Sequence, residues 1–193
     1  MKKKSTQIIY LNGPSSSGKS TLARSLQSAF DIPFLCIGID NIIQWMPEKL
    51  NDWTGGYAPL GYSFKKSVDD FGHPIQEIHA GPYAKRIPHI FREVVLALAR
   101  LGEHVVVDDV SFGKKEVDEW KKALKNYRVL WVGVNAPLAI LEQREKERGD
   151  RIFGSARAQF HKVHVGTEYD ILVDTYHENN DEIVDKITSL IVP

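Results

Sequence analysis

Short apolar runs alternate with longer amphipathic stretches along most of this chain. The runs have the length and β-branched content of strands and cover residues 7–11, 34–39, 104–107, 128–134 and 169–173. The run at 128–134 is almost continuously apolar, which is typical of a strand buried on both faces. Apolar residues at helical spacing lie between or after these runs, over residues 21–30, 83–101, 114–124, 137–148, 156–164 and 180–191.

This alternation predicts an α/β fold of three layers, α/β/α. Five strands would form a parallel sheet with right-handed crossovers and helices on both faces. The length of 193 residues fits a single domain, residues 1–193. In the longest helix, Pro88 either starts the helix at its first position or kinks it, and Gly102 ends it.

Residues 45–81 interrupt the alternation with an irregular stretch rich in aromatic side chains and glycines. Disordered segments are poor in aromatic residues, so we interpret the stretch as an insertion that folds over a substrate. Its candidate substrate contacts are Trp45, Trp53 and Tyr57. The alternative, a satellite cluster that packs against the core, stays open.

The first apolar run leads into a stretch that fits the phosphate-binding pattern G-x-x-x-x-G-K-[ST]. The stretch consists of Gly13, Pro14, Ser15, Ser16, Ser17, Gly18, Lys19, Ser20 and Thr21. In a strand–loop–helix context the loop N–H groups bind phosphate, Lys19 reaches the β- and γ-phosphates, and the Ser20 hydroxyl binds Mg²⁺. The alternative is a turn rich in glycine and serine with a solvated lysine.

Acidic residues follow two of the other apolar runs. Ligands of parallel α/β sheets bind at the carboxyl ends of the strands, so we expect Asp40 on the edge that carries the phosphate-binding loop. There its carboxylate can accept a proton from an attacking hydroxyl. A helix N-cap and a solvated residue at a strand end are the alternatives, and the position alone does not decide between them.

The third apolar run ends in the pair Asp108 and Asp109. An apolar strand ending in Asp has the form of a Walker B segment, whose carboxylate binds Mg²⁺ directly or through water. Neighbouring strand side chains point to opposite faces, so only one of the two can face the metal. We assign Asp108 to the metal and expect Asp109 to orient substrate or to lie behind the metal ligands. A turn with two acids is the alternative.

Three arginines, Arg144, Arg148 and Arg151, lie close together at the end of the 137–148 helix and just beyond it. Planar guanidinium groups match phosphate oxygens, so the cluster predicts a clamp on a bound polyphosphate. Ion pairs with Glu145 and Glu147 are the alternative.

The composition is that of an ordinary globular protein, with 42% hydrophobic and 26% charged residues. The 25 basic and 25 acidic side chains balance, so no net positive charge favours binding to nucleic acid or to an anionic membrane surface. No apolar run approaches the ~20 residues of a membrane span.

The single cysteine, Cys36, lies in an apolar run and is expected to be buried. Since it has no partner for a disulfide, we expect a cytoplasmic protein.

Taken together, these motifs resemble those of the chloramphenicol phosphotransferase-like proteins, small P-loop kinases related in fold to shikimate and nucleoside monophosphate (NMP) kinases. The resemblance runs over nearly the whole chain. It rests on residues 9–20, 38–40, 46–47, 107–110, 130–134, 144, 148–151, 163–164, 168–170, 173–175 and 192–193.

The resemblance implies ATP-dependent phosphorylation of a substrate hydroxyl, with Asp40 as the general base. It also implies that residues 144–160 form a lid with phosphate-binding arginines, and that the sheet order is 2-3-1-4-5. The insertion at residues 45–81 looks longer and more aromatic than the antibiotic-binding segment of the family, which leaves the acceptor open.

Two other functions stay in view. One is a kinase for nucleosides, nucleotides or sugar nucleotides, including toxin-like kinases. The other is a regulator that binds a nucleotide without catalysis. Asp40 argues against the regulator, because a pure switch needs no acceptor base. Nothing in the sequence indicates an oligomeric state.

Overall fold

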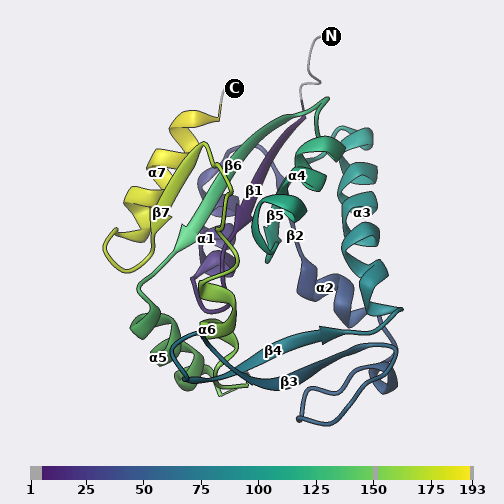
Figure 1. The fold of residues 1–193 in the computed structure, drawn as a ribbon. Helices are drawn as coiled ribbons and strands as arrows, with labels where there is room; N and C mark the ends of the chain where they lie inside the picture. Colours follow the sequence, from purple (N-terminus) through teal and green to yellow (C-terminus); the bar gives the residue numbers. More distant parts are fainter. Residues whose placement is uncertain (1–5, 150–151, 192–193) are drawn as a thin grey trace.

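A five-stranded parallel sheet forms the centre of the computed structural model, which describes residues 6–149 and 152–191 (Figure 1). Its strands, in spatial order, are β2 (Phe34–Gly38), β5 (His104–Asp109), β1 (Gln7–Asn12), β6 (Arg128–Asn135) and β7 (Ile171–Asp174). Every neighbouring pair is parallel. The predicted α/β fold with five parallel strands is therefore confirmed.

The predicted strand order of 2-3-1-4-5 needs correction, because numbering along the whole chain gives 2-5-1-6-7. Two strands that were not predicted, β3 (Tyr62–Val68) and β4 (Pro74–Ala80), take the third and fourth numbers. They form a separate antiparallel hairpin within the insertion that was expected to be irregular. The overlooked sequence signal was an aspartate and a glycine three residues apart, which is typical of a turn. In the structure the Asp69 side chain accepts backbone hydrogen bonds there, and Gly72 has a φ of 83°.

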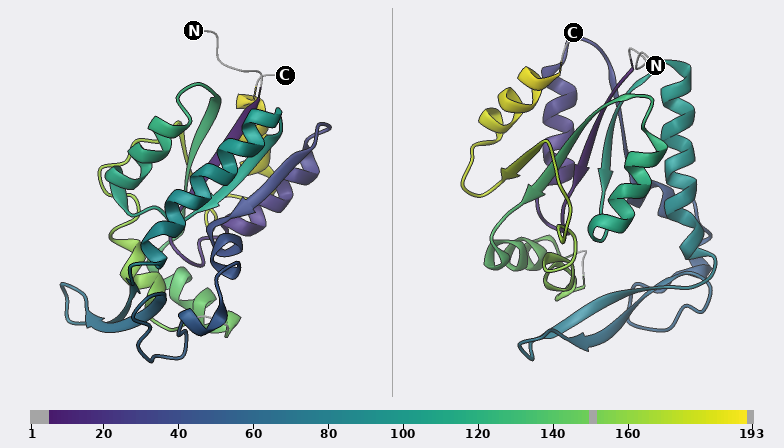
Figure 2. Two further views of the ribbon diagram at one scale, coloured as in Figure 1. Left: turned by 90° about the vertical axis from the view of Figure 1, so that its right-hand side faces the viewer. Right: turned by 45° about the horizontal axis from the view of Figure 1, so that its top comes forward.

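Helices cover both faces of the sheet, as the views in Figure 2 show. Side chains of β1 alternate between the two faces: Ile8 and Tyr10 pack on one side, Ile9 and Leu11 on the other. The first face is covered by α3 (Ile87–Leu101) and α4 (Gly113–Ala123). The second is covered by α1 (Lys19–Ala29) and α7 (Asn180–Leu190). The three predicted layers are thus present.

Short elements gather at the carboxyl edge of the sheet (Figure 1). They are α2 (Ile39–Gln44), α5 (Leu138–Arg148), α6 (Ser155–Phe160) and the 3₁₀ turns Glu48–Leu50 and Ala84–Arg86. The hairpin lies beyond the same edge, so the sheet and the hairpin face each other across this region. No helix within residues 6–149 and 152–191 is both long and apolar enough to span a bilayer.

Two expectations about single residues are decided by the fold. Pro88 lies in the first turn of α3, which supports a helix start rather than a kink, and Gly102 ends the helix with a φ of 95°. Cys36, in contrast, is exposed rather than buried. It lies on β2, the edge strand of the sheet, where Leu35 is also 41% exposed. An edge strand has neighbours on one side only and is covered less completely.

The core under α3 and α4 contains aromatic rings in contact with one another, and this generates a stability prediction. Phe91 is 1% exposed and meets the Trp120 ring edge-on at a centroid distance of 5.1 Å. We expect Phe91→Ala to lower the free energy of unfolding by ~3–5 kcal/mol, because it removes buried apolar surface and leaves a cavity. Urea unfolding measures this change. Leu101→Ala in the same helix is the control, since Leu101 is 78% exposed and should change stability little. Equal losses in both variants would contradict this account of the core.

Candidate active site

The phosphate-binding loop between β1 and α1 is shaped by close backbone packing. A Cβ on Gly13 would lie 2.2 Å from the carbonyl oxygen of Val134 on β6, so only glycine fits there. Ser16 has a φ of 65°, a left-handed conformation that is unusual for a residue other than glycine and that occurs at functional sites. The Ser16 and Ser17 hydroxyls are buried without a hydrogen-bond partner among the described residues. Buried hydroxyl donors in a glycine-bounded loop suit an anion.

Lys19 brings a positive charge into this loop. Its side chain is buried, and Nζ donates a 2.9 Å hydrogen bond to the carbonyl oxygen of Pro14. The lysine therefore curls over the loop from the first turn of α1. The structure thus places the Lys19 ammonium group against the start of the same loop.

Asp108 meets the phosphate-binding loop at Ser20. The Ser20 hydroxyl donates to Oδ2 of Asp108 over 2.6 Å, although the two residues are far apart in sequence. Burial raises the pKa of the Asp108 carboxyl; Lys19 and Ser20 lower it, whereas the charge of Asp40 raises it further. A hydroxyl beside a carboxylate is a donor set that suits Mg²⁺, which is held by few protein oxygens together with phosphate and water. Among the described residues, no group of three or more His, Cys, Asp or Glu side chains is arranged to hold a metal ion by itself.

Asp40 lies in the first turn of α2 at the same edge. The helix begins at Ile39 with Gly38 as its N-cap, and the Asn41 side chain accepts a 2.8 Å hydrogen bond from the Gly38 amide. Asp40 is therefore not the helix cap, which removes one of the two alternatives to a functional role. Its side chain is exposed, and its charge reaches Asp108.

Asp109 points away from this corner into the core beneath α3 and α4. Its Oδ2 accepts hydrogen bonds from the hydroxyls of Tyr10 (2.8 Å) and Ser111 (2.6 Å) and from Nε1 of Trp120 (2.8 Å). Burial, with the Asp109 charge as the next cause, raises the pKa of Tyr10 well above its ordinary value. Of the two expected roles for Asp109, these contacts favour the position behind the metal ligands over a contact with substrate.

Arg144 is joined to the loop through Thr175, at the end of β7. Its guanidinium donates to Oγ1 of Thr175 (2.9 Å) and to the Thr175 carbonyl oxygen (3.0 Å). The Thr175 hydroxyl in turn donates to the carbonyl oxygen of Ser17 over 2.8 Å. Arg144, Arg148 and Thr175 line a cavity of about 390 Å³ beside the loop, which we call the nucleotide-side cavity. Arg151 lies outside the described residues.

One known family matches most of this chain. The sequence profile of the chloramphenicol phosphotransferase-like proteins matches residues 6–192. This chain belongs to that family. The resemblance found in the motifs is therefore confirmed.

Similar proteins agree with this membership. A candidate O-phosphotransferase of Mycobacterium tuberculosis is 31% identical over 172 residues, which covers 88% of this chain and 75% of that protein. A sugar kinase from Janibacter has the same fold, with a TM-score of 0.62 at 15% identity, over 95% of this chain and 93% of that chain. The adenosine phosphosulfate (APS) kinase CysC of Mycobacterium tuberculosis gives a TM-score of 0.61 at 14% identity, over 99% of both chains. Family and fold together support phosphotransferase activity.

In this family member, Glu145 has a structural role that the sequence did not indicate. The side chain is 1% exposed and accepts hydrogen bonds from the amide of Gly154 (2.7 Å), the hydroxyl of Ser155 (2.6 Å) and the amide of Ala156 (2.8 Å). Glu145 thus satisfies the N-terminal donors of α6. Its oxygens are engaged there, which weakens the alternative that Glu145 neutralises Arg144.

Helix α6 also contacts the phosphate-binding loop directly. Oε1 of Gln159 accepts a 2.6 Å hydrogen bond from the amide of Ser15. Sequence reasoning missed Gln159, because a single glutamine in a helix carries no motif. Thr175 was missed as well, and the available signal was its place directly after the last strand, on the edge where ligands bind.

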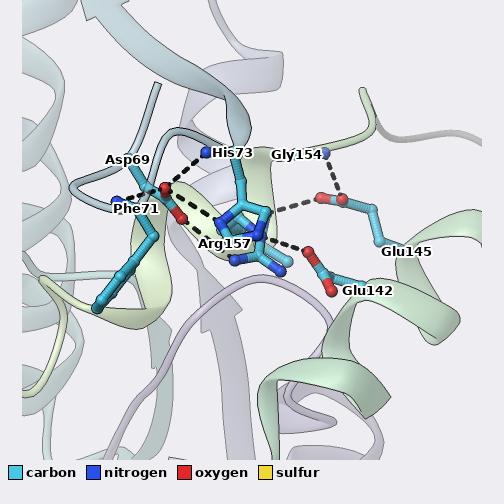
Figure 3. Close-up of polar contacts among 8 residues, drawn as sticks. Asp69, Phe71, His73, Glu142, Glu145, Gly154 and Arg157 are labelled. Atoms are coloured by element: carbon cyan, nitrogen blue, oxygen red, sulfur yellow. Dashed lines mark hydrogen bonds and ion pairs between the residues drawn. The ribbon is translucent and has the colours of Figure 1, made fainter. Parts of the chain in front are cut away.

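Arg157 ties the hairpin to helix α5, as Figure 3 shows. Its guanidinium contacts Asp69 in the hairpin turn at 3.1 Å and Glu142 of α5 at 2.6 Å. Asp69 is further held by the amides of Phe71 (2.9 Å) and His73 (2.8 Å). The hairpin is thereby fixed to the segment that carries Arg144.

The three aromatic residues proposed as substrate contacts do not converge. Trp53 packs on the hairpin residues Tyr62 and Phe64, with ring centroids 6.0 and 5.6 Å apart. Tyr57 lies 5.7 Å from the ring of His79, and Trp45 is 65% exposed. None of the three lines the nucleotide-side cavity. These packings favour the satellite-cluster interpretation for Trp53.

The Asp69 anchor makes stability depend on pH. Burial alone would raise the pKa of Asp69, but hydrogen bonds from His73, Arg157 and Phe71 outweigh it and lower the pKa from 3.8 to about 2. A carboxyl whose pKa is lower in the folded state contributes stability above its unfolded value and loses that contribution as the pH falls. We therefore expect the stability difference between wild type and Asp69→Asn to be largest above pH 3.8 and to shrink towards pH 2.

Urea unfolding across this pH range measures that difference. Asp70→Asn is the matched control, because Asp70 is the exposed neighbour in the same turn. If the difference in the free energy of unfolding between wild type and Asp69→Asn stays constant as the pH falls, Asp69 does not stabilise the fold through its charge.

Proposed function

We propose that this protein is a Mg²⁺- and ATP-dependent kinase that transfers the γ-phosphoryl group to a hydroxyl of a small molecule. One observation carries the proposal: the 2.6 Å contact between Ser20 and Asp108, next to the buried Lys19 and within reach of the charge of Asp40. A phosphate-binding loop with only a structural role would not need two further carboxylates at its mouth.

The donor nucleotide would bind along the loop. The amides and the unpartnered Ser16 and Ser17 hydroxyls would hold phosphate oxygens, with Lys19 neutralising the β- and γ-phosphates. The nucleotide-side cavity would take the base and sugar, with Arg144 and Arg148 in its wall. Arg144, Arg148 and Arg151 would stabilise charge on the transferring group as residues 144–160 close over it.

Mg²⁺ would be held by Ser20 and Asp108, the latter directly or through water, and would neutralise charge on the phosphates. The hydrogen bond between these two residues keeps both oxygens within reach of one ion. Asp108 is half-buried, and its partial removal from water strengthens its attraction for a cation.

Asp40 would accept the proton of the acceptor hydroxyl. Asp40 lies exposed in the first turn of α2 and its charge acts on Asp108, which supports a role beside the transferring group. The names of similar proteins, an O-phosphotransferase and a sugar kinase, are consistent with a hydroxyl acceptor.

A nucleoside, nucleotide or sugar-nucleotide kinase is the alternative within the same chemistry. A non-catalytic nucleotide-binding regulator is the alternative of another class.

The role of Asp40 is tested by Asp40→Asn. We expect ATP binding to stay within a few-fold of wild type, whereas phosphoryl transfer falls by roughly 10²-fold or more, because the amide cannot accept the proton. Calorimetric titration measures binding, and a screen of metabolites with labelled ATP identifies the phosphorylated product and its rate of formation. Asp31→Asn, at an exposed position after α1, is the control. Unchanged transfer in Asp40→Asn would refute the base assignment, and ATP binding with no phosphorylated product would favour the regulator.

The role of Arg144 is tested by Arg144→Lys. The lysine keeps the charge but cannot reach both oxygens of Thr175 with a planar fork. We expect phosphoryl transfer to fall by about 10²–10³-fold, with a smaller loss of ATP affinity. Arg100→Lys, on the exposed end of α3, is the control for the substitution itself. Equal kinetics for Arg144→Lys and wild type would show that Arg144 serves only the local structure.

A further inference from the structure

A second cavity, of about 330 Å³, lies between β4, the start of α4 and α6. We call it the hairpin-side cavity. We infer that it is the acceptor site of the proposed kinase and that it takes a hydroxyl-rich molecule without a phosphate group. This inference rests on the proposed function and adds the place and the chemical class of the acceptor.

The first support is the position of this cavity relative to the phosphate-binding loop. Gln159 lines the hairpin-side cavity and at the same time accepts a 2.6 Å hydrogen bond from the Ser15 amide at the start of the loop. The nucleotide-side cavity is lined by Ser16, next to Ser15, and by Gly18 and Thr21 further along the loop. The two cavities therefore adjoin the same loop, so a donor in one and an acceptor in the other would both reach it.

The second support is the kind of side chain in the wall. Gln76, Glu116 and Gln159 supply carboxamide and carboxylate groups, which accept and donate hydrogen bonds at several points. Phe112 and Ile78 add apolar surface beside them. A wall with many polar groups and one aromatic ring suits the alternating C–H and O–H faces of a polyol better than a flat, apolar molecule.

The third support is the charge of the wall. Lys162 forms an ion pair with Glu77, so its charge is already compensated, and Glu116 adds a further carboxylate. Arg157, the nearest arginine along α6, is held by Asp69 and Glu142. No arginine lines the cavity among the described residues. A phosphate group on the acceptor would meet net negative charge without a guanidinium partner, so neutral or cationic acceptors are favoured over nucleotides.

Glu116 is the specificity-determining group in this wall. Its Oε2 accepts a 2.7 Å hydrogen bond from the Phe112 amide, which fixes the carboxylate at the start of α4. A carboxylate has further lone pairs, so Glu116 can also accept a hydrogen bond from an acceptor hydroxyl or ammonium group. Glu116→Gln keeps the size and one acceptor oxygen but removes the charge.

The experiment measures ADP release by wild-type protein with ATP, Mg²⁺ and a panel of acceptors. One half of the panel contains monosaccharides, inositols and amino sugars; the other contains nucleoside monophosphates and nucleotide sugars. We expect release with members of the first half only. We expect Ile78→Trp, which fills the cavity from β4, to raise the acceptor KM at least about tenfold, and Glu116→Gln to raise it by roughly tenfold. The KM for ATP should not change in either variant.

Val68→Trp is the matched control, because Val68 is a 63% exposed residue of the same hairpin and does not line the cavity. Its acceptor KM should equal that of wild type. Release with the phosphorylated acceptors, or an unchanged acceptor KM in Ile78→Trp, would each overturn the inference. These results are distinct from failure of the proposed function itself, which would appear as absent ATP binding in wild type, as ATP binding with no phosphorylated product from any acceptor, or as full activity in Asp40→Asn.

Discussion

The parallel pairing of β1 with its two neighbours is the constraint on which the site depends. The register places Leu11 opposite Asp108 and Asn12 opposite Gly133, so the loop after β1 emerges between the ends of β5 and β6. From there Ser20 reaches Asp108, and Gly13 passes against the Val134 carbonyl oxygen. A slip of one residue would turn every side chain of a strand to the opposite face, exchanging Asp108 and Asp109. The buried apolar side chains on both faces of β1 prevent this slip.

The different environments of the two neighbouring acids follow from the same pleat. Asp108 faces the hydroxyl of Ser20 at the mouth of the loop, whereas Asp109 lies in the core among three hydrogen-bond donors. One residue of separation along the strand thus divides an acid at the mouth of the loop from an acid in the core. The buried Asp109 in turn holds Tyr10 and Trp120, which pack against each other at 5.3 Å and support the sheet beneath the site.

Helix α6 connects parts of the molecule that the sequence keeps apart. Glu145 satisfies its first turn, Arg157 links it to the hairpin, and Gln159 reaches the phosphate-binding loop. The hairpin and the phosphate-binding loop are thus joined through α6 by direct contacts.

The sequence by itself determined the alternation of strands and helices, the phosphate-binding motif and the family, because each depends on residues that are contiguous or regularly spaced. Asp40 and Asp108 could be placed on one edge for the same reason: each directly follows a strand. Only the tertiary structure decided the contacts between distant segments, such as Gln159 with Ser15 and Arg144 with Thr175. Spacing carries no information about such pairs, since they depend on how α5 and α6 pack against the sheet edge. The tertiary structure also decided the hairpin, because β3 pairs with β4 and not with the main sheet. It decided the exposure of Cys36 as well, because β2 is the edge strand of that sheet.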